Sequence, residues 1–109
     1  RMENHAALLW IVPAKVEGTW SWNLIGVDYQ MKVNQQFQEI NINLTSNIRT
    51  YKIENSLISG RRISFTATNN SNQKRFVFSG NVENGKIEGI VQIRDGNNES
   101  VEFWRAVLE

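Results

Sequence analysis

The chain has 109 residues, of which 40% are hydrophobic and 21% are charged, a composition typical of one soluble globular domain and not of a disordered or fibrous protein. Its formal net charge of +1 excludes an overall electrostatic field that would recruit nucleic acid or an anionic membrane. It has no cysteine, which excludes disulfides and thiolate metal sites and agrees with a reducing compartment, so we expect a cytoplasmic protein.

The first apolar segment, residues 6–12 (AALLWIV), is a continuous run that ends at Pro13. It is too short to span a bilayer, and its lack of alternation indicates either a strand buried on both faces or a stub of helix. We therefore predict an N-terminal extension over residues 1–15 and a β-barrel domain over residues 16–109. The chain starts without a methionine and ends in Leu108-Glu109, a pair typical of the junction with a C-terminal tag, so we interpret it as a piece of a longer protein.

The chain is organised around residues 16–24 (VEGTWSWNL), where Gly18, Trp20, Trp22 and Leu24 alternate with polar residues, as in a strand with one buried face. A second alternating strand is predicted over residues 29–37. Beyond it the apolar positions change from odd to even numbers, and we interpret this change as a bulge or corner within residues 38–41. The same alternation, with turn signals such as Asn84-Gly85, predicts strands over residues 40–44, 48–53, 57–58, 63–67, 75–82, 87–93 and 101–107.

From residue 16 onward the chain therefore consists of about eight strands with short loops between them. Short connections make successive strands antiparallel, and no stretch shows sustained helical periodicity. We predict an all-β fold, a single eight-stranded antiparallel up-and-down barrel of the lipocalin-like type. An open sheet or a sandwich is the alternative.

A barrel of eight strands is just wide enough to be filled by its own side chains or to enclose one small molecule. We predict a filled interior, because large aromatic side chains occupy many inward positions. The inward candidates are Trp20, Trp22, Tyr29, Phe37, Tyr51, Phe65, one of Phe76 and Phe78, and Phe103. If the interior were a ligand cavity instead, its lining would include Trp20, Trp22, Phe37, Phe65 and Phe103.

The sequence contains no pattern for catalysis, cofactor binding or metal binding. Its one histidine, His5, lies in the polar N-terminal segment, so no Ser-His-Asp set can be assembled. The glutamates mostly flank turns or take outward positions, which are not typical of paired catalytic carboxylates. A glycine-rich turn between a strand and a helix, as required for dinucleotides, is missing. Aromatic strands could stack single-stranded nucleic acid, but the near-neutral charge provides no basic groove.

Residues 18–20 (Gly-Thr-Trp) resemble the Gly-x-Trp pattern on the first strand of lipocalins, fatty-acid-binding proteins and avidins. In that superfamily a basic residue of the last strand packs across the indole and closes the end of the barrel. The resemblance implies that Arg105 plays this part against Trp20 through a cation–π contact, worth about 0.5–2 kcal/mol.

A longer resemblance covers most of the chain. Its segments are LLWIVPAKVEGTWSW (residues 8–22), QQFQ (35–38), RRISFT (61–66), FSGNVENGKIEG (78–89) and FWRA (103–106). Together they resemble the C-terminal all-β domain of bacterial class I S-adenosylmethionine-dependent methyltransferases. Asn41 replaces a glycine of that pattern and Leu108 replaces a basic residue.

This resemblance implies an upstream Rossmann-like catalytic domain in the same chain, which would bind S-adenosylmethionine, and no cofactor in the present fragment. Residues 6–12 would be the severed last strand of the catalytic sheet, and we expect them to pair with a barrel edge or to form a homodimer contact. The implied function is that of an accessory barrel that assists substrate access or assembly, with no nucleic-acid or membrane partner. A calycin-like carrier of a small hydrophobic ligand and a free-standing scaffold are the alternatives.

Overall fold

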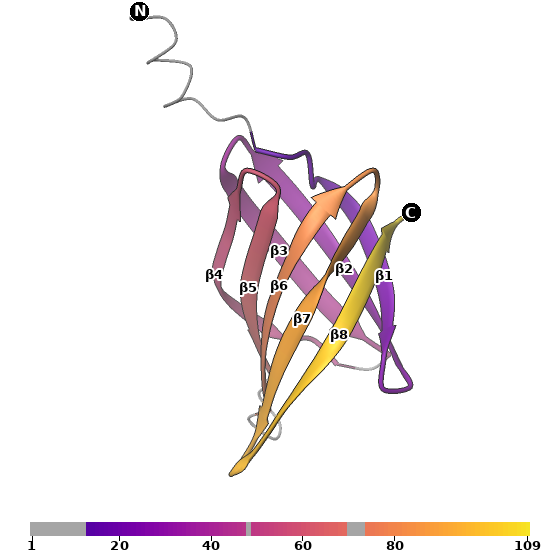
Figure 1. Ribbon diagram of the computed structural model, residues 1–109, viewed down its shortest axis with the longest axis vertical. Helices are drawn as coiled ribbons and strands as arrows, with labels where there is room; N and C mark the ends of the chain where they lie inside the picture. The colour runs from indigo at the N-terminus through magenta and orange to yellow at the C-terminus, as the bar shows by residue number, and fades with distance from the viewer. Residues whose placement is uncertain (1–12, 48, 70–73) are drawn as a thin grey trace, which may run out of the picture.

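The computed structural model describes residues 13–47, 49–69 and 74–109. Within them the chain forms strands and no helix, and the strands wind into a nearly closed barrel (Figure 1). The predicted all-β up-and-down barrel is therefore confirmed, whereas the predictions for residues 6–12 lie outside the described residues. The eight strands are β1 (Gly18–Leu24), β2 (Val27–Gln36), β3 (Glu39–Ser46), β4 (Lys52–Ser59), β5 (Arg62–Thr68), β6 (Arg75–Glu83), β7 (Lys86–Asp95) and β8 (Asn98–Leu108).

The strands follow the order β3-β2-β1-β8-β7-β6-β5-β4, and every paired neighbour is antiparallel. Two seams are much shorter than the hairpin ladders. Strands β1 and β8 pair only where Trp20 meets Leu108 and Ser21 meets Val107. Beside the seam between β3 and β4, Thr45 of β3 forms an isolated bridge with Thr50, which lies just before β4 begins. Figure 1 shows β8 beside β1 near the C-terminus and leaving it toward the opposite end of the barrel.

Two-residue turns explain the changes of apolar phase along the chain. The turn between β2 and β3 consists of Phe37 and Gln38. Such a turn places odd-numbered residues of one strand opposite even-numbered residues of the next, so that Val33 lies opposite Ile42 and both are buried. The predicted bulge or corner within residues 38–41 is therefore wrong, because the phase changes where the chain reverses. The expected Asn84-Gly85 turn is present, with φ of 54° and 75°.

Strand β4 joins residues 52–53 of one predicted strand (48–53) to the separately predicted strand 57–58. Its pairing with β5 shifts register between Glu54 and Leu57. Asn55 and Ser56 lie together opposite Phe65, and Asn55 has a positive φ of 57°. This geometry is a β-bulge, which bends the strand without ending it.

Residues 13–17 cross one end of the barrel before β1 begins. The N–H of Ala14 donates to the carbonyl oxygen of Gly60 at 2.6 Å. The side-chain amide of Gln35 accepts from the N–H of Val16 at 2.7 Å and donates to the carbonyl of Ala14 at 3.0 Å. Trp20 Nε1 donates to the Val16 carbonyl at 2.9 Å, and the Val16 side chain is fully buried. This segment closes that end of the core.

Strand β8 faces the core with the opposite side from the one predicted. Trp104 and Ala106 are buried, whereas Phe103 is 87% exposed. The Trp104 indole lies opposite Gly89 and donates from Nε1 to the carbonyl oxygen of Ser79 at 3.0 Å. Glycines leave space on the inner face here, so that the larger ring of Trp104 is accommodated inside and Phe103 is directed outward.

Candidate functional site

The interior of the barrel is packed with aromatic rings. Trp22 stacks against Tyr29, with centroids 5.7 Å apart, and meets the ring of Trp104 edge-on at 5.0 Å. Phe78 stacks on Phe65 at 4.8 Å and also contacts Trp104 edge-on at 5.0 Å. These separations fall in the range where ring pairs add about 0.5–1.5 kcal/mol each beyond their buried area. The ring cluster, defined as Trp22, Tyr29, Tyr51, Phe65, Phe76, Phe78 and Trp104, fills the space that a carrier would keep for its ligand.

Hydroxyl groups occupy one side of the ring cluster. The Tyr51 hydroxyl lies 3.3 Å from the hydroxyl of Ser46, and the rings of Tyr51 and Tyr29 are 5.9 Å apart. Burial raises the pKa of Tyr29 well above its ordinary value, and the hydrogen bond to Tyr51 raises that pKa further. Tyr29 is therefore a neutral hydroxyl at physiological pH, suited to holding the core together and not to taking a proton from a substrate.

The raised pKa of Tyr29 predicts a loss of stability in alkali. The stability that comes from keeping Tyr29 protonated in the folded protein is fully present below the ordinary tyrosine pKa of about 10. It is lost as the pH rises toward the higher pKa that Tyr29 has in the folded state. The free energy of unfolding should fall in that range by at most about 1.4 kcal/mol per pH unit. Urea unfolding of the wild type and of Tyr29→Phe from neutral to alkaline pH measures this, and the variant should lose less. Equal losses in both proteins would contradict the assignment.

One buried donor inside the barrel has no acceptor. Trp22 is 5% exposed, and its Nε1 makes no hydrogen bond within the described part of the chain. An unpaired buried N–H costs about 1–3 kcal/mol. In the part of the chain that the structure describes, Trp22 Nε1 is thus the buried side-chain donor that an acceptor on a small molecule could satisfy.

The predicted closing pair of Trp20 and Arg105 does not form inside the barrel. Trp20 is buried on the inner face of β1, and its register partner on β8 is Leu108. Arg105 points outward, and its Nε lies 2.8 Å from Glu88 Oε2 on β7. The prediction is wrong because the even-numbered residues of β8 face the core. Trp104 therefore lies inside the barrel and Arg105 lies outside.

The residues predicted to line a cavity divide into two groups. Trp20, Trp22 and Phe65 lie inside, but they pack against other side chains. Phe37 and Phe103 are 52% and 87% exposed, so their predicted inward positions are wrong. Phe37 lies outside because it is the first residue of a tight turn and has a positive φ of 62°. Sequence reasoning missed Trp104, for which Gly89 on the neighbouring strand was the available signal.

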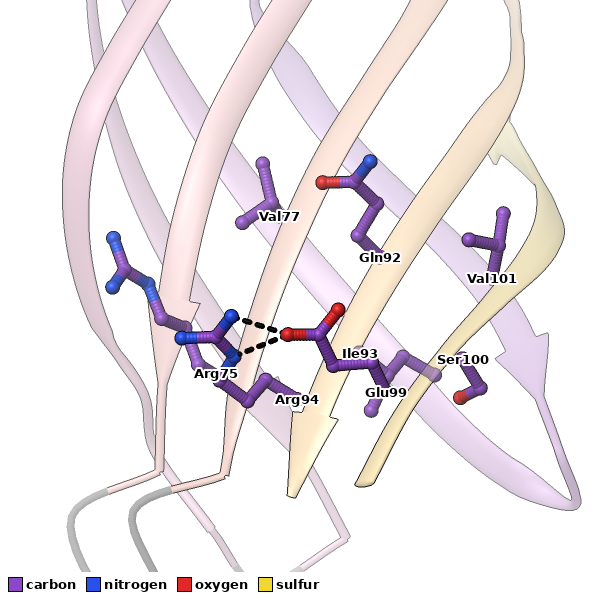
Figure 2. A pocket seen from close by; sticks show the side chains of 8 residues that line it. All are labelled: Arg75, Val77, Gln92, Ile93, Arg94, Glu99, Ser100 and Val101. Carbon is purple, nitrogen blue, oxygen red and sulfur yellow. Dashed lines mark hydrogen bonds and ion pairs between the residues drawn. The ribbon is translucent and has the colours of Figure 1, made fainter. Parts of the chain in front are cut away.

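Hollows occur on the outer surface of the barrel. One of about 470 Å³ lies on β6, β7 and β8. Figure 2 shows Arg94 and Glu99 at this hollow, joined by hydrogen bonds and an ion pair. Arg75 and Gln92 line it together with the apolar Val77. The Glu99 carboxylate is engaged by Arg94, and Ser100 also lines the hollow.

The described residues contain no histidine and no group of three acidic side chains placed to hold a metal ion. They also contain no helix long and apolar enough to cross a membrane. What the structure brings together is a packed aromatic interior and an outer surface whose ion pairs are exposed.

Comparisons with known proteins do not extend this description. No protein-family model, no curated protein and no solved structure matches the chain.

Proposed function

We propose that this chain is an accessory β-barrel domain, catalytically silent by itself, of a cytoplasmic S-adenosylmethionine-dependent methyltransferase. The observation that supports the first part is the ring cluster, which fills the interior with aromatic side chains, including Tyr29 with its raised pKa. A barrel packed in this way acts through its outer surface, by binding to another domain or by shaping the entrance to that domain's site.

The methyltransferase part of the proposal is supported by sequence resemblance, chiefly that of residues 8–22 and 78–89. The partner would be the catalytic domain of the same chain, which would hold S-adenosylmethionine. The net charge of +1 supports an arrangement without nucleic acid or membrane.

The test uses the complete gene product. Its reading frame should contain an upstream unit of strand, glycine-rich turn and helix. Deleting residues 16–109 should leave S-adenosylmethionine affinity unchanged and lower kcat/KM for methyl transfer at least about tenfold, or about 1.4 kcal/mol. A reading frame without that unit, or binding of S-adenosylmethionine by the 109-residue chain alone, would contradict the proposal.

A carrier of a small hydrophobic molecule is the second candidate, and one observation favours it. Trp22 Nε1 is a buried donor without an acceptor in the described residues, as expected if a ligand oxygen were to complete it. A carrier would have to displace part of the ring cluster on binding. Its affinity would therefore be reduced by the cost of opening the core.

A further inference from the structure

Among the described residues, strand β8 has no pairing partner along most of one edge. It pairs with β7 from Asn98 to Val107, but with β1 only at Val107 and Leu108. In Figure 1 the lower part of β8 runs away from β1 with no described strand on that side. Residues 98–106 contain no proline, no lysine and no bulge, which are common devices that keep a strand edge from pairing with another chain.

Two backbone hydrogen bonds near the C-terminus identify which backbone groups this edge presents. Leu108 N–H donates to Gly85 on the β7 side, whereas Glu109 N–H donates to Thr19 on the β1 side. Because successive residues of a strand direct their N–H and C=O groups to alternate sides, the odd-numbered residues point away from β7. The free edge therefore offers the N–H and C=O groups of Glu99, Val101, Phe103 and Arg105.

The outer face beside this edge is apolar. Phe103 is 87% exposed and Val101 is 60% exposed, and Ile90, the register partner of Phe103 on β7, is also exposed. A hollow of about 740 Å³ lies next to Phe103 and reaches across to Asn23 on β1. Exposed apolar residues beside an unpaired strand edge mark a surface that associates with another strand.

We infer that a second copy of this chain pairs with the free edge, β8 against β8, antiparallel and about a two-fold axis at Val101. The free backbone groups then meet in register, with Val101 opposite Val101 and Glu99 opposite Phe103 of the other copy. The four side chains of Val101 and Phe103 form one apolar strip across the junction. Such an interface is self-complementary, as two-fold symmetry requires.

Charge decides between this register and its neighbours. With the axis at Val101, Ser100 faces Glu102 of the other copy, and Glu99 lies diagonal to Arg105, within reach of long side chains. With the axis at Glu102, two glutamates would face each other, which is destabilising. With the axis at Ser100, Phe103 would lie opposite Asn97 in the β7–β8 turn and outside the ladder. Of these three axes, the one at Val101 joins the apolar residues and opposes no like charges.

The inference is independent of the methyltransferase proposal, since it uses only the edge, the exposed residues and their charges. Cross-linking tests it on the 109-residue chain, which has no cysteine of its own. Val101→Cys should form a disulfide-linked dimer under mild oxidation, because directly paired residues on such strands lie about 5.5 Å apart, within disulfide range. Leu57→Cys is the matched control, because Leu57 is exposed to a similar extent on the distant β4 and should remain monomeric.

A second pair of variants tests the apolar strip by sedimentation equilibrium. The wild type should dimerise reversibly, and Phe103→Lys should raise the dimer Kd at least about tenfold. Phe37→Lys makes the same change at another exposed phenylalanine and should leave the Kd unchanged. A wild type that stays monomeric, Val101→Cys cross-linking no better than Leu57→Cys, or faster cross-linking through Glu102→Cys would overturn the inference.

Discussion

Gly89→Ala should lower the free energy of unfolding by about 3 kcal/mol or more. A Cβ added at Gly89 would lie 1.9 Å from the carbonyl oxygen of Ser79 and 2.5 Å from the Cα of Gly80. Both neighbours are backbone atoms, so no side-chain rotation relieves the clash and β6 must move away from β7. The movement would also disturb Trp104, whose indole donates to the same Ser79 carbonyl.

Gly96→Ala provides the control for this prediction. Gly96 lies in the β7–β8 turn at a φ of 64°, and a Cβ there would meet nothing within 4 Å. Its cost should be limited to the backbone conformation, about 1–2 kcal/mol. Urea unfolding of the three proteins measures the difference, and equal losses in the two variants would show that β6 and β7 are not packed as closely as described.

Trp104→Ala should destabilise the barrel by about 3–5 kcal/mol, whereas Phe103→Ala should change the free energy of unfolding by no more than about 0.5 kcal/mol. The two residues are adjacent, but Trp104 is 3% exposed and contacts Trp22, Phe65 and Phe78, while Phe103 lies on the outer face. The removal of the indole leaves a cavity and deprives the Ser79 carbonyl of its donor.

Thermal and urea unfolding at concentrations that keep the chain monomeric measure these two changes separately from association. Circular dichroism of the folded variants checks that each retains its strands. A larger loss of stability in Phe103→Ala than in Trp104→Ala would indicate that Phe103 faces the core, as expected from the sequence. It would contradict the structure of β8.

The barrel could be predicted from sequence because its local signals agree with one another. The Asn84-Gly85 turn supplies two residues that tolerate positive φ, and alternating apolar residues fix the inner face of β1 and β2. The turn at Phe37 had no such signal, since a phenylalanine at positive φ is unusual. The apolar phase change that follows it therefore supported a bulge and a turn equally well.

The inner face of β8 could not be predicted from the strand alone. Its sequence places apolar residues at both odd and even positions, Val101 and Phe103 against Trp104 and Ala106. Which set of residues faces the core depends on β6 and β7, where glycines make space for the ring of Trp104. These strands are other parts of the chain, so the sequence of β8 does not contain this information. The free edge of β8 likewise depends on how far β1 follows it, which alternation does not determine.

Indole N–H resonances of Trp20, Trp22 and Trp104 report most directly on whether aromatic rings fill the interior. In a ¹⁵N NMR titration with a hydrophobic fluorophore, a filled barrel predicts that these three resonances keep their positions, and that any weak binding affects residues around Phe103 on the outer face. A saturable shift of the Trp22 resonance with one ligand per barrel, together with fluorophore binding that is weakened in Trp22→Phe, would contradict the filled interior and identify the chain as a carrier.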